Sequence, residues 1–279
     1  MKVGLLFSKV RIEEKLILQE FAKLSADVAH INPQDLSLTM EKNDFGGVEI
    51  LLNREIAQTR AELILEFADQ SGIKTVNSAA STKLSNNKAL TNYVLTKHAV
   101  PTPKTVIAFS AEEALKAANT IGYPLVIKPI WGSWGRLLSK VSSPEVVETI
   151  LEHKKALSNP SHSIFYLQEY IAKPDRDIRV FMIGDEPICA MYRTSTHWLT
   201  NTARGAVAHS MTLDKEATEL AIKTVKALGV DVAGVDMVES KDGYKVLEVN
   251  ATPEFHELKK VAQVNIAELI ARYILKQTI

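Results

Sequence analysis

Two segments near the end of the chain decide how that part folds: Val232-Ala233-Gly234-Val235-Asp236-Met237-Val238 and Val246-Leu247-Glu248-Val249-Asn250. Both are rich in valine and other apolar residues, as strands are. Asp242-Gly243 lies between them and is a strong hairpin turn signal. The sequence therefore predicts an antiparallel hairpin.

This hairpin brings carboxylates together. A turn centred on Asp242 sets Asp236 opposite Glu248, and alternation puts Glu248 and Asn250 on one face. Two facing carboxylates repel each other, so the pattern favours a cation between them. Oxygen ligands without His or Cys suit Mg²⁺ or Mn²⁺. A solvated hairpin face is the alternative reading of the same pattern.

Composition excludes several classes of protein. The 279 residues include 33 basic and 33 acidic side chains, so the net charge of zero gives no support for nucleic acid or an anionic membrane as main partner. The single cysteine, Cys189, excludes an intramolecular disulfide and a multi-cysteine metal site, and its apolar surroundings predict a buried thiol. No apolar run approaches the roughly 18 residues of a membrane span, and the first residues are too short for a signal peptide. We expect a cytoplasmic protein.

The order of strand and helix patterns divides the chain into parts. Residues 1–80 alternate strands and helices, which predicts a small parallel α/β layer, but they lack the Gly-x-Gly-x-x-Gly of a dinucleotide site. Residues 81–99 belong to a helix running from 78 to about 98, which connects to the next part. Residues 100–185 form an α+β unit with a glycine-rich loop. Residues 186–279 form a mainly antiparallel unit with the hairpin and a final helix from about 261 to 275.

Several polar residues stand where burial or loop geometry makes them candidates for binding. Lys128 ends an apolar strand, a costly position unless an anion meets it. The following loop, residues 132–136, can present backbone N–H groups to a phosphate, although ordinary turn geometry also explains its glycines. Asp177 and Arg179 share one face of a strand. A long polar loop, residues 196–205, follows Arg193 and is either decoration or a binding loop.

Taken in order along the chain, these polar residues and loops resemble the motifs of the ATP-grasp superfamily of carboxylate–amine ligases. The likeness is close to the RimK-like group and closest to the LysX-type ligases, which load amino acids onto the small carrier protein LysW. It covers essentially the whole chain. The phrases that carry it are Lys128-Pro129, Gly132-Ser133-Trp134-Gly135-Arg136-Leu137, Gln168-Glu169-Tyr170, Arg176-Asp177-Ile178-Arg179, Asn201-Thr202-Ala203-Arg204-Gly205 and Glu248-Val249-Asn250.

The resemblance implies an ATP-grasp fold of class α+β and α/β. It has an N-terminal parallel α/β (pre-ATP-grasp) domain, a central α+β lid domain and a C-terminal antiparallel α+β domain, with ATP held between the last two. It implies ATP contacts at Lys88, Lys128, Gly132, Ser133, Trp134, Gly135, Arg136, Leu137, Leu138, Gln168, Glu169, Tyr170, Ile171, Asp177, Arg179, Arg193 and Asn201. Gln168 to Ile171 would form the adenine hinge and Asp177 would meet the ribose. Asp236, Glu248 and Asn250 would hold Mg²⁺ or Mn²⁺. The residues expected to take part in catalysis are Lys128 and Arg193.

The chemistry implied is phosphoryl transfer from ATP to a carboxylate, followed by attack of an amine. Such a site needs charge neutralisation and alignment more than a protein nucleophile. In LysX-type enzymes the carboxylate belongs to the C-terminal glutamate side chain of LysW and the amine to α-aminoadipate. A sister group uses glutamate. The substrate contacts implied here are Arg193, His197, Thr202, Ala203, Glu254, Phe255, His256, Glu257 and Leu258.

The sequence departs from the family at positions that bear on the substrate. Glutamate-type relatives carry Gly-Phe at the position of Glu257-Leu258, and aminoadipate-type relatives usually carry Asn and a small residue, so this chain has neither pair. His256 replaces a common lysine, Ala206 a common glycine, and Asn87 a common aspartate. The absent Gly-Phe and the Asn-Thr-Ala-Arg phrase at 201–204 favour α-aminoadipate.

The resemblance also implies partners and leaves rivals open. Because the carrier is acidic, Lys9, Arg11, Arg54 and Arg60 are a candidate docking surface, with ordinary solvated charges as the alternative. Relatives commonly assemble as dimers or tetramers, so we expect a homo-oligomer. One rival function is a RimK-like glutamate ligase acting on another protein or a cofactor. A more distant rival is a non-catalytic nucleotide-binding regulatory protein.

Overall fold

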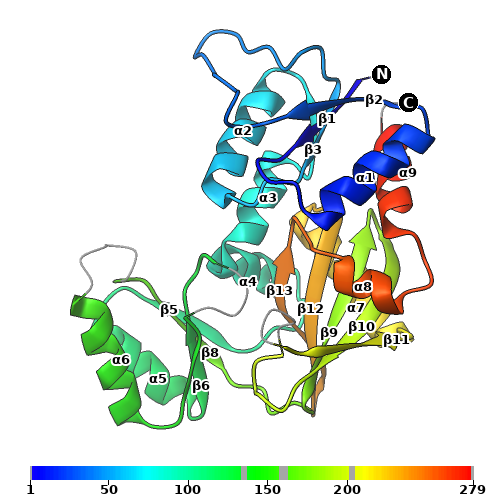
Figure 1. Cartoon of the computed structure of the whole chain (residues 1–279). Coiled ribbons are helices and arrows are strands. Elements are labelled where there is room, and N and C mark those ends of the chain that lie inside the picture. Colours follow the sequence, from blue (N-terminus) through cyan, green and yellow to red (C-terminus); the bar gives the residue numbers. More distant parts are fainter. Residues whose placement is uncertain (1, 133–136, 157–162, 201–204, 278–279) are drawn as a thin grey trace.

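The computed structural model describes residues 2–132, 137–156, 163–200 and 205–277. The first unit is a parallel sheet in the order β2-β1-β3-β4, formed by β1 (Lys2–Leu6), β2 (Asp27–Ile31), β3 (Ile50–Asn53) and β4 (Lys74–Val76). Helices α1 (Ile12–Lys23) and α2 (Gln58–Gln70) connect these strands (Figure 1). The predicted parallel α/β layer is confirmed, because β1 pairs in parallel with both β2 and β3.

The middle unit is an antiparallel sheet in the order β5-β8-β6-β7, and it is covered by two helices. Leu125, Ile127 and Leu167 turn toward the helices and form their core. The alternate residues, Lys128 and Gln168 among them, face the other way. The elements are β5 (Thr105–Ala108), α5 (Ala111–Ile121), β6 (Leu125–Lys128), β7 (Ser139–Val141), α6 (Pro144–Ala156) and β8 (Phe165–Glu169).

The third unit is an antiparallel sheet in the order β11-β10-β9-β12-β13. Its strands are β9 (Arg176–Ile183), β10 (Glu186–Thr194), β11 (Val207–Met211), β12 (Val232–Ser240) and β13 (Gly243–Asn250). One face packs against α7 (Lys215–Leu228) through residues such as Val180 and Met182. On the opposite face β9 is charged in its first half and apolar in its second. Asp177 and Arg179 come first, and Phe181 and Ile183, which follow on the same face, belong to a hydrophobic core.

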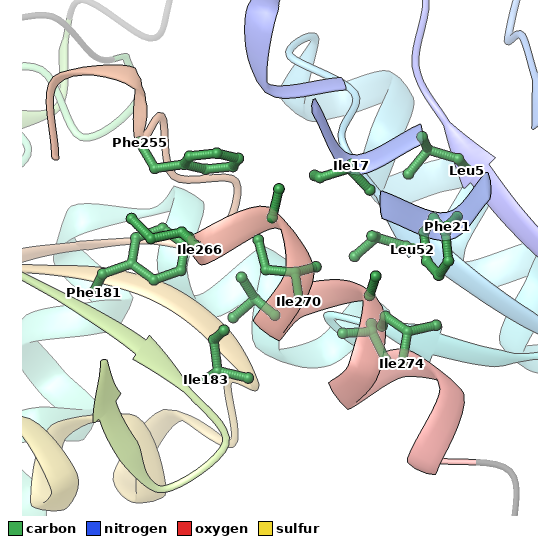
Figure 2. Packing of buried hydrophobic residues seen from close by; sticks show 14 of the residues in the cluster. Leu5, Ile17, Phe21, Leu52, Phe181, Ile183, Phe255, Ile266, Ile270 and Ile274 are labelled. Carbon is green, nitrogen blue, oxygen red and sulfur yellow. The ribbon is translucent and has the colours of Figure 1, made fainter. Parts of the chain in front are cut away.

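A hydrophobic cluster joins the first and third units. Helix α9 (Ile266–Lys276) presents Ile266, Ile270 and Ile274 at i, i+4 spacing, and these side chains lie between the N-terminal unit and the third sheet (Figure 2). The remaining labelled members come from both sides: Leu5, Ile17, Phe21, Leu52, Phe181, Ile183 and Phe255. The last helix of the chain thus fixes the first domain relative to the third. Within the described residues no helix has both the length and the apolar composition needed to cross a membrane.

The structure corrects three expected elements. The helix expected from 78 to 98 is two helices, α3 (Ala79–Asn86) and α4 (Lys88–Lys97), because the side chain of Asn87 accepts hydrogen bonds from Ala89 N and Leu90 N and caps the second one. The final helix, expected from about 261, begins at Ile266 as α9, and a separate short helix that was not expected, α8 (His256–Val261), precedes it. The boundary expected at 185 is misplaced, because β9 pairs with β10 and β12 of the third sheet.

The hairpin of β12 and β13 forms as predicted, with one local difference. Ser240 pairs with Gly243, so the turn is tighter than one centred on Asp242. An irregularity between Asp236 and Met237 shifts the register by one residue, and Asp236 then stands opposite Glu248. A β-bulge of this kind re-aims side chains and is common beside active sites.

Candidate active site

Charged side chains form a ladder across one face of the third sheet. Asp177 on β9 stands opposite Arg193 on β10, and Arg179 on β9 stands opposite Asp236 on β12. Glu248 on β13 continues the row beside Asp236. Directly opposed residues share a face and interact, so opposite charges are paired across β10, β9 and β12, and Glu248 on β13 adds a second carboxylate next to Asp236.

Arg193 is held rigidly within this ladder. Only 4% of it is exposed, and its Nε and Nη2 donate to Asp177 Oδ1 and Oδ2 at 2.6 and 2.9 Å. Asp236 Oδ1 lies 3.2 Å from Arg193 Nη2. Burial opposes the charge of Arg193, but the carboxylates of Asp236 and Asp177 outweigh it and raise its pKa. A preorganised buried cation of this kind is suited to stabilise charge that develops during a reaction.

Lys128 is the second buried cation of the site. Its Nζ donates to Gln168 Oε1 at 2.9 Å and lies 4.9 Å from the centre of the Tyr166 ring. Burial lowers the pKa of Lys128 to about 8, with a raising contribution from Glu248. In the part of the chain that the structure describes, Lys128 is therefore contacted by an amide oxygen and an aromatic face, and the anion that its burial predicted is not among these contacts. Lys88, the first residue of α4, donates to Gly132 O and lies 3.7 Å from Glu248 Oε2.

Two cavities meet at these cations. The smaller, about 110 Å³, lies between the middle and third sheets, and the larger, about 580 Å³, lies between the third sheet and the N-terminal unit. Both are lined by Lys88, Pro129, Gly132, Arg193 and Glu248. A ligand in one cavity therefore comes close to a ligand in the other.

Most residues predicted to bind ATP lie around these cavities. The smaller cavity is lined by Lys88, Lys128, Gly132, Leu138, Gln168, Glu169, Tyr170, Ile171, Asp177 and Arg193, and Leu137 and Arg179 line the larger one. Ser133, Trp134, Gly135, Arg136 and Asn201 lie outside the described residues. Asp177 also has a protein partner that the sequence did not reveal, because both of its oxygens accept hydrogen bonds from Arg193, and its contact with a ribose stays a prediction.

The three predicted metal ligands differ in the partners that their side chains have within the protein. Both oxygens of Asp236 accept hydrogen bonds from the guanidinium of Arg179. The positive charges of Arg179 and Arg193 together outweigh desolvation and lower the pKa of Asp236. The cations that the structure places beside the facing carboxylates are thus side chains, and metal binding by Asp236, Glu248 and Asn250 stays a prediction. Glu248 and Asn250 line the larger cavity. The buried Nδ2 of Asn250 has no hydrogen-bond partner among the described residues.

On the substrate side, four of the predicted contacts line the larger cavity: Arg193, Glu254, His256 and Glu257. Phe255 and Leu258 were wrongly assigned, because they are 1% and 0% exposed and pack in the hydrophobic core. Exposed His197 is absent from the described lining of both cavities. Thr202 and Ala203 lie outside the described residues.

The proposed carrier surface also needs correction. Arg54 is 2% exposed and donates to Glu14 and to Pro253 O, so it cannot be part of a docking surface. Arg11 pairs with Glu14 at 2.7 Å and lines the larger cavity. Charge alone did not distinguish Arg54 from a surface arginine, because its acidic partner Glu14 lies 40 residues away in the sequence.

Sequence reasoning missed Gly234 and part of the cavity wall. A Cβ at Gly234 would stand 3.1 Å from Arg179 Cδ and 3.2 Å from Pro253 Cβ, so this glycine makes room for the arginine that holds Asp236. Asn53, Glu55, Thr82 and Ser85 of the N-terminal half line the larger cavity. None belongs to a motif, so no sequence signal pointed to them.

Comparison with known protein families assigns nearly the whole chain to two domain families. Residues 85–274 match the RimK-like ATP-grasp domain and residues 3–84 match the LysX preATP-grasp domain. The chain belongs to the RimK-like ATP-grasp family. It is accordingly an ATP-dependent ligase, of a fold family that uses ATP with a divalent metal, and the ATP-grasp fold expected from the sequence is confirmed.

Individual relatives of this RimK-like ATP-grasp chain agree with the family assignment. It is 37% identical to an α-aminoadipate–LysW ligase, LysX, of Saccharolobus solfataricus, over 93% of this chain and 96% of that protein. It is 31% identical to a glutamate–LysW ligase, ArgX, of Sulfolobus acidocaldarius, with 98% of both chains covered. The crystal structure of a RimK domain ATP-grasp protein from Sphaerobacter thermophilus superposes with a TM-score of 0.84 at 26% identity, over 99% of this chain and 100% of that one.

Proposed function

We propose that the protein joins α-aminoadipate to a LysW-type carrier. ATP transfers its γ-phosphoryl group to the side-chain carboxylate of the carrier's C-terminal glutamate, and ADP leaves. The amine of α-aminoadipate then attacks the acylphosphate carbonyl. Phosphate leaves, the nitrogen loses a proton, and an amide bond remains.

The observation that carries this proposal is the junction of the two cavities at Lys88, Arg193 and Glu248. A ligase of this kind must bring a nucleotide and two further substrates to one point. The smaller cavity, at the Gln168–Ile171 hinge, is assigned to ATP. The larger cavity, with a volume of about 580 Å³, is assigned to the carboxylate and the amine.

The chain's own cations have distinct parts in this scheme. Lys128 and Lys88 bind the phosphates, and an anion beside Lys128 would offset the burial that lowers its pKa to about 8. Arg193 stabilises charge on the transferred phosphoryl group, and Asp177 fixes its guanidinium. A divalent metal, Mg²⁺ with Mn²⁺ as an alternative, would be held by Glu248 and Asn250 beside Asp236. When bound it would neutralise phosphate charge.

Glutamate is a second candidate for the amino acid. A glutamate–LysW ligase is similar to this chain over 98% of its length, and Glu257, at the position that differs between the two groups, lines the larger cavity. The enzyme would then serve arginine synthesis, or both pathways. Assembly as a dimer or tetramer and a cytoplasmic location belong to the same proposal.

The experiment is a ligation assay with ATP, Mg²⁺ and purified LysW-type carrier, offering α-aminoadipate and glutamate separately. Intact-protein mass spectrometry of the carrier measures the product. We expect the carrier to gain the mass of one aminoadipate residue. A gain with glutamate alone would replace the primary assignment by the second candidate, and no gain with either amino acid would reject the LysW function.

A further inference from the structure

The wall of the larger cavity that comes from the N-terminal half carries polar atoms without partners. Asn53 stands at the end of β3, and Thr82 and Ser85 lie three residues apart on one face of α3. All three residues line the cavity. They are 2%, 1% and 7% exposed, respectively.

Within the described part of the chain, Asn53 Nδ2, Thr82 Oγ1 and Ser85 Oγ are buried and form no hydrogen bond. This is unusual, because a helical Thr or Ser hydroxyl commonly donates to the carbonyl four residues earlier. Thr224 of α7 does so, to Leu220 O at 2.7 Å. Buried polar groups without partners are rare and costly, and several together call for an explanation.

The unpartnered atoms are mainly donors. An amide NH₂ and two hydroxyls together match a ligand group that accepts several hydrogen bonds, and a carboxylate is such a group. Neutral donors of this kind stabilise a carboxylate in its charged form. The acid on the same wall, Glu55, has its charge offset by Arg60, whose Nη2 donates to Glu55 Oε1 at 2.9 Å, while the buried Glu55 Oε2 has no partner among the described residues.

We propose that Asn53, Thr82 and Ser85 form a subsite for the carboxylate at the far end of the amino-acid side chain, the end remote from the reacting amine. This inference rests on the proposed function, because it assigns part of the same cavity. The reacting amine must lie at the junction near Arg193 and Glu248, so the opposite end of the molecule extends toward the N-terminal wall. A small amino acid reaches side chains this deeply buried more readily than the chain end of a folded carrier.

Such a subsite has a consequence for specificity. α-Aminoadipate and glutamate differ by one methylene in the distance between amine and side-chain carboxylate. With the amine fixed at the junction and the far carboxylate fixed at the wall, the cavity selects an amino acid by the distance between these two groups. A missing hydrogen-bond partner at a polar site discriminates more strongly than a missing methylene alone.

The test uses Thr82→Val and Ser85→Ala, which remove the hydroxyls and keep the shape, with Thr224→Val as matched control. Calorimetry measures binding of α-aminoadipate and of norleucine, whose side chain has the same length and ends in a methyl group. Steady-state ligation gives KM for the amino acid, ATP and carrier. We expect Thr82→Val to weaken α-aminoadipate binding about tenfold or more and to leave norleucine unchanged. KM for ATP and for the carrier should not change, and Thr224→Val should bind both amino acids like wild type.

A thermal unfolding measurement separates this role from a structural one. Without ligand, Thr82→Val should be as stable as wild type or more stable, because its hydroxyl has no partner to lose, whereas Thr224→Val should be less stable. Unchanged α-aminoadipate binding in both cavity variants would mean that the wall holds water only. Equal losses for α-aminoadipate and norleucine, or a raised KM for the carrier alone, would also overturn the proposal. If wild type binds α-aminoadipate but does not load the carrier, the proposed function fails and the subsite is still tested by calorimetry.

Discussion

Replacement of Lys128 by methionine should stabilise the free protein while removing its activity. A pKa lowered from 10.5 to about 8 corresponds to about 3 kcal/mol of stability that the charged lysine costs. The substitution also leaves Gln168 Oε1 without its donor, which costs about 1–2 kcal/mol. The net gain is about 1–2 kcal/mol at pH 7, or a rise in Tm of roughly 2–8 °C.

The pH dependence of this gain follows from the direction of the shift. Below pH 8 the lysine is protonated in both the folded and the unfolded chain, so the full cost is present. Between about 8 and 10.5 the folded protein has lost the proton and the unfolded chain still binds it, so wild type becomes relatively more stable as pH rises. The advantage of Lys128→Met should therefore shrink across this window and be gone above it.

The assay is urea or thermal unfolding at pH 7 and pH 10, with and without ATP and Mg²⁺. Exposed Lys97 on α4 provides the control, since Lys97→Met should change stability little at either pH. ATP should stabilise wild type more than Lys128→Met, because only wild type offers the buried cation. A variant that is less stable than wild type at pH 7 without ligand would refute the reasoning, as would an advantage that persists at pH 10.

Three further predictions concern the charged ladder. Asp177→Asn should lower kcat about 100-fold with little change in KM for ATP, because Arg193 loses its bidentate partner; a rise in KM for ATP alone would instead favour the ribose role. Glu248→Gln should abolish ligation without lowering Tm. Asp236→Asn should lower both the ligation rate and Tm, since it leaves the Arg179 guanidinium without its bidentate carboxylate, whereas Arg193 keeps Asp177; equal Tm values would show that the ion pairs of Asp236 do not matter for stability. Gly234→Ala should reduce kcat several-fold by displacing Arg179, measured by steady-state ligation, and a wild-type rate would mean that the 3.1 Å contact relaxes freely.

Local sequence patterns were enough to predict much of the fold. The hairpin turn, the apolar alternation of β12 and β13 and the strand and helix order of the first unit were all readable, because they depend on residues within a few positions of one another. Errors arose where a single side chain acted as a cap, as Asn87 does between α3 and α4. The position of β9 was also misjudged, because the sheet that a strand joins depends on its distant partners.

The sequence by itself determined that Asp236 faces Glu248, that Lys128 is buried, and that the chain carries the motifs of a RimK-like ATP-grasp ligase. Only the tertiary structure decided which cations accompany the carboxylates. Arg179 and Asp236 are 57 residues apart, and β9 brings them together as a bidentate pair. Only the fold shows that Arg54, Phe255 and Leu258 are buried. The reason is physical: alternation fixes which residues share a face, whereas the charge, space and partners on that face come from strands and helices that fold against it from elsewhere in the chain.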